Sequence, residues 1–164
     1  MLNSTNKPLL LVDVDGVINA LSPLPFATEQ EFRSPEGFEI RVPSGTSARL
    51  TRLEKLFECI WASTWEHSAY PDIGQRLGVH PWPVIEFNRP VAGATWKLKD
   101  VRDYVAERPL AWVDDELYAD ARTWAKSREA QGIPTLLVHA DAAAGLSEQN
   151  VITLEQWVEN LSSV

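Results

Sequence analysis

The stretch Leu9-Leu10-Leu11-Val12-Asp13-Val14-Asp15-Gly16 decides the fold class of this chain. Its four consecutive apolar residues predict a short strand that is buried on both faces, as the strands of parallel sheets are. Two aspartates and a glycine follow at once. In open α/β sheets ligands bind beyond the carboxyl ends of the strands, so the same stretch also indicates where polar chemistry is expected.

Four further apolar runs each predict a strand, at residues 59–62, 83–87, 110–113 and 135–138. Between and after these runs, apolar residues recur at helical spacing. The helical sets are Leu50, Leu53, Leu56 and Phe57; Leu98, Val101 and Val105; Leu117, Ala121, Trp124 and Ala125; and Leu154, Trp157, Val158 and Leu161. Thr153 and Gln156 have the spacing of a capping box, which predicts the start of the last helix. Strands alternating with helices predict a three-layer α/β fold, Rossmann-like, around a central parallel sheet.

Residues 19–42 interrupt this alternation and are rich in Pro, Phe and Glu. The turn Pro35-Glu36-Gly37, followed by residues 38–42, predicts a β-hairpin that forms a small flap. The chain has 164 residues and no repeat or linker-like tract, so we expect one domain over residues 1–164 with the flap as an insertion. Such a flap could close over a site or only decorate the edge of the sheet.

Composition excludes several classes of protein. The net charge of -8 argues against a protein that coats nucleic acid, because phosphate contacts need Lys and Arg. The single cysteine, Cys59, cannot form an internal disulfide and lies in an apolar run, which predicts a buried and unreactive thiol. Asp13 interrupts the first apolar run too early for a signal peptide or a membrane span. We therefore expect a cytoplasmic protein with no membrane partner; the sequence does not indicate its oligomeric state.

Acidic and hydroxyl side chains follow three of the predicted strands. Asp13 and Asp15 follow the first strand, Ser63 and Thr64 the second, and Asp114 and Asp115 the fourth. Parallel strands end at one edge of their sheet, so these side chains are expected to converge. Two unit charges ~4 Å apart repel by about 4 kcal/mol at an effective dielectric near 20. Mg²⁺, which prefers oxygen ligands and also binds phosphate oxygens, would offset that repulsion.

A lysine would offset it further, and either Lys97 or Lys99 can reach the site from the helix before the Asp114 strand. Residues two apart on an extended segment point to the same side. One of Asp13 and Asp15 can therefore attack phosphorus while the other handles the leaving-group proton. Gly16 then lets the chain turn away without crowding the site.

Structural explanations compete with this chemical one. A calcium loop would need Asp or Asn at Val17, Gly at Ile18 and Glu at Leu24, so it is excluded. The pair Asp114-Asp115 could instead favour a helix dipole at an N-terminus. Ser63 or Thr64 could likewise cap the helix that follows.

The segments Asp13-Val14-Asp15-Gly16-Val17, Ser63-Thr64 and Trp112-Val113-Asp114-Asp115, with the lysine between the last two, occur in the order typical of one enzyme family. Over nearly the whole chain they resemble the haloacid dehalogenase (HAD) superfamily of aspartate-nucleophile phosphatases. The resemblance implies a HAD fold with a small flap and no large cap. It also implies Mg²⁺-dependent hydrolysis of a phosphomonoester through an aspartyl-phosphate. The segments 61–66 and 95–98 are similar to a bacterial HAD subgroup that also occurs as domains of multifunctional RNA-repair proteins.

The resemblance implies a role for each matching residue. Asp13 would be the nucleophile, and Asp15 the general acid and later the base. Ser63, or Thr64 beside it, would hold a phosphoryl oxygen, and Lys97, in preference to Lys99, would neutralise nucleophile and phosphate. Asp115 would bind Mg²⁺ with Asp13 and the backbone carbonyl of Asp15, with Asp114 in support.

Four further residues are candidates for contact with the substrate: Gly16, Trp65, His67 and Arg89. Trp65 and His67 follow the second strand, and Arg89 follows the run 83–87, from which it could touch a distal phosphate. Each of these three could equally be an ordinary surface or core residue. The expected substrate is a nucleotide or a small phosphorylated metabolite. An uncovered site would also admit nucleic-acid ends, which makes an end-processing phosphatase in RNA or DNA repair the alternative. A non-catalytic binding module is disfavoured, because every catalytic position holds a competent residue.

Overall fold

The computed structural model describes residues 7–88 and 93–163, and a parallel sheet of four strands forms its centre. The strands lie in the order β4 (Glu58–Trp61), β1 (Leu9–Val12), β5 (Leu110–Asp114) and β6 (Thr135–His139). Leu10 of β1 aligns with Cys59 on one side and Ala111 on the other. β1 is thus an inner strand, which is why its apolar run is unbroken. The predicted α/β class with a central parallel sheet is confirmed.

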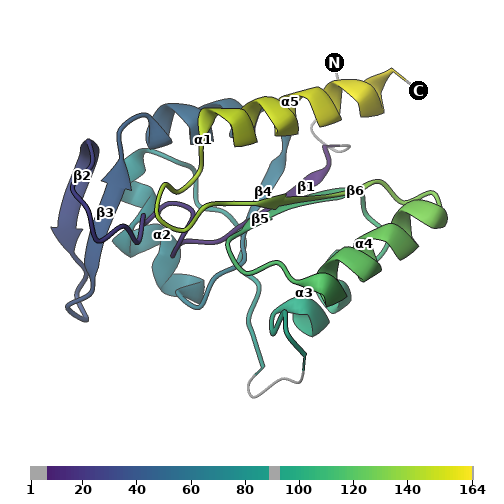
Figure 1. Ribbon diagram of the computed structural model, residues 1–164, viewed down its shortest axis with the longest axis horizontal. Helices are drawn as coiled ribbons and strands as arrows, with labels where there is room; N and C mark the ends of the chain where they lie inside the picture. The colour runs from purple at the N-terminus through teal and green to yellow at the C-terminus, as the bar shows by residue number, and fades with distance from the viewer. Residues whose placement is uncertain (1–6, 89–92, 164) are drawn as a thin grey trace.

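Helices cover both faces of this sheet (Figure 1). On one face lie α1 (Thr46–Leu56) and α5 (Glu148–Ser162), and on the other α3 (Leu98–Val105) and α4 (Ala119–Ala130). Alternate side chains of β1 enter two separate cores. Leu10 packs in the core that α1 and α5 cover, whereas Leu11 packs in the core that α3 and α4 cover. The arrangement is compatible with a Rossmann-like fold.

The expected hairpin is present, and it consists of β2 (Thr28–Arg33) and β3 (Glu39–Pro43), paired antiparallel. It lies at one end of the sheet, close to α2 (Figure 1). Ser34 closes its turn, because the Ser34 hydroxyl accepts a hydrogen bond from the Phe38 amide at 3.1 Å. Ile40 and Val42 are fully buried against the main core. The hairpin is therefore packed onto the domain rather than loosely attached to it.

Short helical turns connect β4 to the next segment. They are η1 (Glu66–Ser68), α2 (Ala69–Asp72) and η2 (Gly74–Leu77). The strand predicted at 83–87 does not form, and only Val84 makes an isolated bridge, to Trp61. To extend that bridge toward the N-terminus, residue 83 would have to donate a backbone hydrogen bond, and Pro83 has no N–H. In the other direction, the Phe87 amide donates to the Glu66 carboxylate instead, at 3.1 Å.

The predicted start of the last helix is wrong, because the helix begins well before Thr153. α5 begins at Glu148, and Ser147 is its N-cap in a capping box with Asn150. Thr153 lies inside the helix, where its hydroxyl donates to the Gln149 carbonyl at 3.0 Å. Across the two described ranges, no helix is long and apolar enough to cross a membrane.

Cys59 lies in β4, and only 5% of its surface is exposed. Burial raises the pKa of its thiol well above the ordinary value. The prediction of a buried structural cysteine is confirmed.

Candidate functional site

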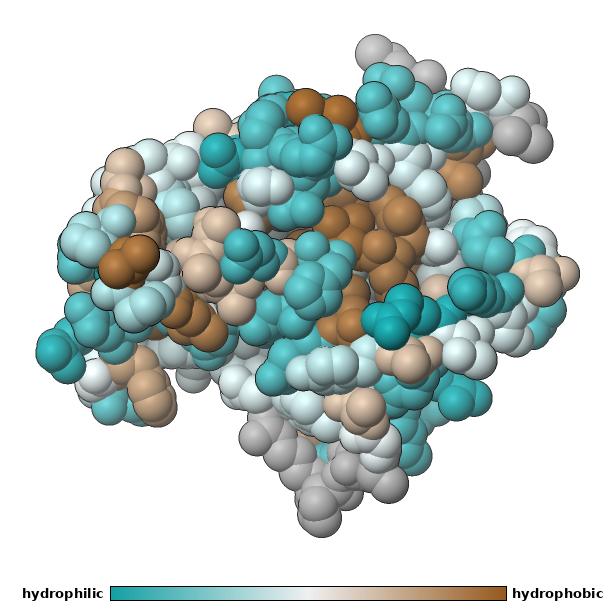
Figure 2. Space-filling view, in the orientation of Figure 1, coloured by the Kyte–Doolittle hydropathy of each residue, from teal (hydrophilic) through white to brown (hydrophobic). Residues whose placement is uncertain are grey.

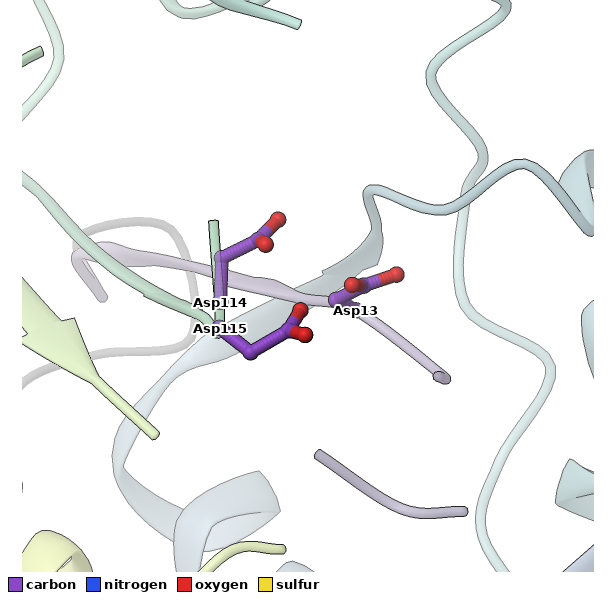
Figure 3. Close-up of side chains that lie close together, drawn as sticks. All are labelled: Asp13, Asp114 and Asp115. Carbon is purple, nitrogen blue, oxygen red and sulfur yellow. The ribbon is translucent and has the colours of Figure 1, made fainter. Parts of the chain in front are cut away.

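Three aspartates meet at the carboxyl end of the sheet. Asp13 directly follows β1, Asp114 is the last residue of β5, and Asp115 comes next. One carboxylate oxygen of each lies within 4.8 Å of the others. Figure 3 shows Asp114 and Asp115 extending from the end of β5 toward the side on which Asp13 lies. The convergence of these three carboxylates was predicted, and it follows from the pairing of β1 with β5, which aligns Val12 with Val113. The carboxylate of Asp15, which was expected to join them, does not belong to this group.

Lys97 is the cation of this cluster. Its side chain reaches in from the residue before α3, and its Nζ lies 3.1 Å from Asp13 Oδ1 and 2.6 Å from Asp114 Oδ2. The same ammonium donates to the Ala62 carbonyl at the end of β4, at 2.9 Å. Lys99, the other candidate, is exposed and forms an ion pair with Asp103 on its own helix. The structure thus brings Lys97, and not Lys99, into the site.

The cluster carries an excess of negative charge, since three carboxylates face one ammonium. Burial raises the pKa of Asp13 well above its usual value; Lys97 opposes this effect and the charge of Asp114 adds to it. Burial, with the charge of Asp114, raises the pKa of Asp115 to about 6. Burial alone would lower the pKa of Lys97, but Asp13 and Asp114 outweigh it and raise that pKa, so the lysine stays charged.

These observations test whether a divalent cation fits the site. Burial, together with the charge of Asp114, disfavours the ionised forms of Asp13 and Asp115, and a bound cation would offset both effects. The cluster's candidate ligands are carboxylate oxygens that lie within 4.8 Å of one another, and neither histidine nor cysteine belongs to the group. Hard oxygen donors of this kind suit Mg²⁺ rather than zinc. The residues present therefore fit the magnesium ion expected from the sequence.

Gly16 makes room for Asp115. Its φ of +82° is a conformation that favours glycine, and a Cβ added there would lie 2.5 Å from Oδ2 of Asp115. The sequence predicted an uncrowded turn at this position, and it also suggested Gly16 as a substrate contact. In the structure, the immediate neighbour of Gly16 is the Asp115 carboxylate. The lack of a side chain at Gly16 therefore serves mainly to leave room for the Asp115 carboxylate in the cluster.

Both oxygens of the Asp15 carboxylate accept hydrogen bonds. The Trp65 indole N–H donates to Oδ2 at 3.0 Å, and the Asn19 side-chain amide donates to Oδ1 at 2.9 Å. Asn19 also accepts from the Arg41 amide of β3 at 2.8 Å, so it joins Asp15 to the hairpin. Sequence reasoning missed Asn19. The only signal was an asparagine four residues after Asp15, at the spacing of a tight turn.

The two hydroxyl candidates differ in exposure. Ser63 is fully buried, and its Oγ accepts from the Trp65 amide at 3.2 Å, a local turn rather than a helix cap. Thr64 is exposed and lines a cavity. The alternative reading of Asp114 and Asp115 as helix N-terminal residues is wrong. The helix α4 starts at Ala119, and Oδ1 of Asp114 accepts from the Glu116 amide at 2.9 Å.

A cavity of about 570 Å³ is lined by Asp15 and Thr64, each close in sequence to a residue at the end of the sheet, Asp13 or Ser63. Its remaining lining residues are Asn19, Leu21, Glu36, Phe38, Glu39, Trp65 and Ser68, so the hairpin forms part of the wall. Of the predicted substrate contacts that the structure describes, Gly16, Trp65 and His67, only Trp65 lines it. His67 is exposed and lies 2.6 Å from a carboxylate oxygen of Glu86. Arg89 lies outside the described residues.

Two hydrogen-bonded pairs hold the segment that carries Lys97, and the sequence predicted neither. The Thr95 hydroxyl and amide donate to the two oxygens of Asp120, at 2.6 and 2.9 Å, which ties the segment to α4. The Asn88 amide and side chain donate to Asp100 of α3, at 3.1 and 2.9 Å. Both pairs fix the start of α3 and therefore the origin of the Lys97 side chain.

No protein-family model matches the chain, and no curated protein matches it significantly. The assignment of function therefore depends on the residues and distances of this site.

Proposed function

We propose that the protein is a Mg²⁺-dependent phosphomonoester hydrolase of the HAD type, which acts on a nucleotide or small phosphorylated metabolite through an aspartyl-phosphate at Asp13. The observation that carries this proposal is the cluster of the buried Asp13 and Asp114 with the half-buried Asp115, with the Lys97 ammonium 3.1 Å from Asp13. A carboxylate beside an ammonium and an acidic oxygen-donor set is the arrangement that nucleophilic attack on a phosphate requires.

Asp13 and Asp115 would hold the magnesium ion together with the backbone carbonyl of Asp15. Asp114 would support them from behind, because its own oxygens are already engaged by Lys97 and by the Glu116 amide. When bound, Mg²⁺ supplies positive charge that offsets the carboxylates and the phosphate oxygens. The Lys97 ammonium, 3.1 Å from Asp13, reduces the repulsion between an anionic nucleophile and an anionic phosphate.

In the first half-reaction, a carboxylate oxygen of Asp13 forms a bond to phosphorus while the bond from phosphorus to the leaving-group oxygen breaks. Protonated Asp15 donates its proton to that oxygen, so the leaving group departs as a neutral alcohol. Trp65 and Asn19 each occupy one acceptor position on Asp15. Their two hydrogen bonds fix the carboxyl group in orientation and leave a second position on each oxygen for the proton.

In the second half-reaction, Asp15 takes a proton from water as the water oxygen bonds to phosphorus. The bond between phosphorus and the Asp13 oxygen then breaks, which releases inorganic phosphate and regenerates the free carboxylate. Lys97 stabilises Asp13 as it becomes a leaving group, because its ammonium is already directed at Oδ1. Ser63 or Thr64 would hold a phosphoryl oxygen in both steps.

The test is phosphate release from an aryl phosphate, with Mg²⁺ and with EDTA, by the wild type, Asp13→Asn and the matched surface variant Asp103→Asn. We expect Asp13→Asn to lose activity by at least about 10³-fold, as loss of a nucleophile usually does. Asp103→Asn should remain active, since that carboxylate is exposed on α3. Hydroxylamine converts an aspartyl-phosphate to a hydroxamate and releases phosphate, and mass spectrometry should find that hydroxamate at Asp13. Equal rates for the wild type and Asp13→Asn would refute the proposal.

A further inference from the structure

We propose that the cavity beside Asp15 binds the leaving group of the phosphomonoester and selects a flat aromatic group with no further negative charge, such as the base of a mononucleotide. This inference deepens the proposed function and depends on it. It concerns which phosphate esters the enzyme hydrolyses, and it predicts that a mononucleotide is a better substrate than a nucleic-acid end.

Two aromatic side chains give the cavity its affinity for a flat group. Phe38 lies at the turn of the hairpin and is 61% exposed, so its ring is accessible to a ligand in the cavity that it lines. Its ring lies 5.8 Å from that of Trp65, at an interplanar angle of 69°. Figure 2 shows hydrophobic residues reaching the surface at the hairpin end among hydrophilic ones. An aromatic side chain stacks favourably on any base, because every base has a π-face.

Trp65 contacts both the cavity and the proposed proton donor, Asp15. Its indole N–H holds Oδ2 of Asp15, the group proposed to protonate the leaving oxygen, while its ring lines the same cavity. A leaving group that packs against the ring is therefore placed next to its proton donor. The cavity volume, about 570 Å³, is also in the range of small-ligand sites.

The negative charge of the cavity determines which leaving groups it excludes. Asp15, Glu36 and Glu39 line it, and none of the described lining residues is a lysine or arginine. No described residue forms an ion pair with Glu36 or Glu39. A second phosphate in the leaving group would lie near these carboxylates. The repulsion between like charges would weaken the binding of such an ester. A nucleic-acid strand, which carries a phosphate at every nucleotide, is therefore disfavoured.

The first arm of the test compares kcat/KM for the four ribonucleoside 5′-monophosphates with that for ribose 5-phosphate. All five esters break the same kind of phosphorus–oxygen bond, and only the base differs. We expect at least one mononucleotide to exceed ribose 5-phosphate by at least about tenfold. Phe38→Ala should abolish most of that ratio, because it removes a ring on which the base would stack. Tyr104→Ala, which removes an exposed ring on α3, is the matched control and should retain the ratio.

The second arm compares the preferred mononucleotide with the 5′-phosphorylated dinucleotide of the same base. The dinucleotide should be the poorer substrate, and Glu36→Gln combined with Glu39→Gln should reduce the difference. If ribose 5-phosphate is hydrolysed as well as every mononucleotide, or the dinucleotide as well as the mononucleotide, the inference fails while the proposed function stands. If no ester releases phosphate in an Asp13-dependent way, both are overturned.

Discussion

The Lys97 ammonium lies 2.6 Å from Oδ2 of Asp114, and both side chains are withdrawn almost completely from solvent. Charges are costly to bury, and such a pair persists only where its geometry and its other hydrogen bonds are good. Here the lysine also reaches Asp13 and the Ala62 carbonyl, so it joins the ends of β1, β4 and β5. The same ammonium is therefore part of the proposed chemistry and part of the fold.

This relationship makes Lys97 the side chain whose loss should cost the most stability in the site. Lys97→Met removes the partner of a fully buried carboxylate, and breaking a buried pair in this way costs about 3–5 kcal/mol. The free energy of unfolding in urea measures the loss. Lys99→Met, two residues away and exposed, should leave the unfolding midpoint unchanged. Adding Asp114→Asn to Lys97→Met should recover part of the loss; no recovery would contradict the uncompensated-charge explanation.

Gly16→Ala should disturb the cluster more than its backbone strain alone explains. A positive φ costs a residue with a Cβ about 1–2 kcal/mol, and Gly132→Ala, at φ +79° with open space around it, measures that cost. At Gly16 the new methyl group also meets the Asp115 carboxylate, which should add about 1–3 kcal/mol. Thermal or urea unfolding of both variants compares the two costs. Equal losses would mean that Asp115 moves aside freely.

The sequence predicted the fold well where one physical signal was sufficient. Uninterrupted apolar runs identified β1, β4, β5 and β6, because strands buried on both faces must be apolar. The run 83–87, which Glu86 interrupts, forms no strand, since Pro83 lacks the N–H that a longer ladder needs. The start of α5 was misplaced because Asn150, and not a Glu or Gln, completes the capping box with Ser147.

The residues of the candidate site were likewise predicted only in part. Strand ends predicted the meeting of Asp13, Asp114 and Asp115, because parallel strands deliver their next residues to one edge. Asn19 and the Thr95–Asp120 pair could not be predicted. They join segments that only the tertiary fold brings together, and single polar residues carry no periodic signal. For the same reason, sequence alone could not decide between Lys97 and Lys99.

Mg²⁺ should stabilise the wild-type protein through Asp115. A ligand that binds only the folded state at 100 times its dissociation constant adds about 2.7 kcal/mol to the free energy of unfolding. We expect a rise in Tm when Mg²⁺ replaces EDTA. Asp115→Asn should lose most of this rise, because it removes one of the three clustered carboxylates. Asp103→Asn is the matched control and should retain it. An unchanged Tm shift in Asp115→Asn would exclude this residue as a ligand.

The Thr95–Asp120 pair should make stability depend on pH below about 4. Partial burial alone would raise the pKa of Asp120, but the hydrogen bonds from the Thr95 hydroxyl and amide outweigh it and lower that pKa below its ordinary value of 3.8. An acid with a lowered pKa stabilises the fold while it is ionised. Its contribution is present above the unfolded pKa and is lost as the pH falls through the folded pKa.

Asp120→Asn should therefore be less stable than the wild type at pH 7, by about 1–2 kcal/mol, because hydrogen bonds to a charged acceptor are lost. The difference should shrink as the pH falls below 4, where the wild-type carboxyl also takes up a proton. Urea unfolding at pH 7 and pH 3.5 measures it, with Asp103→Asn as the exposed control. Phosphate release should fall as well, because Thr95 anchors the segment that carries Lys97. A difference that is constant across this pH range would show that the charge of Asp120 is not what holds Thr95.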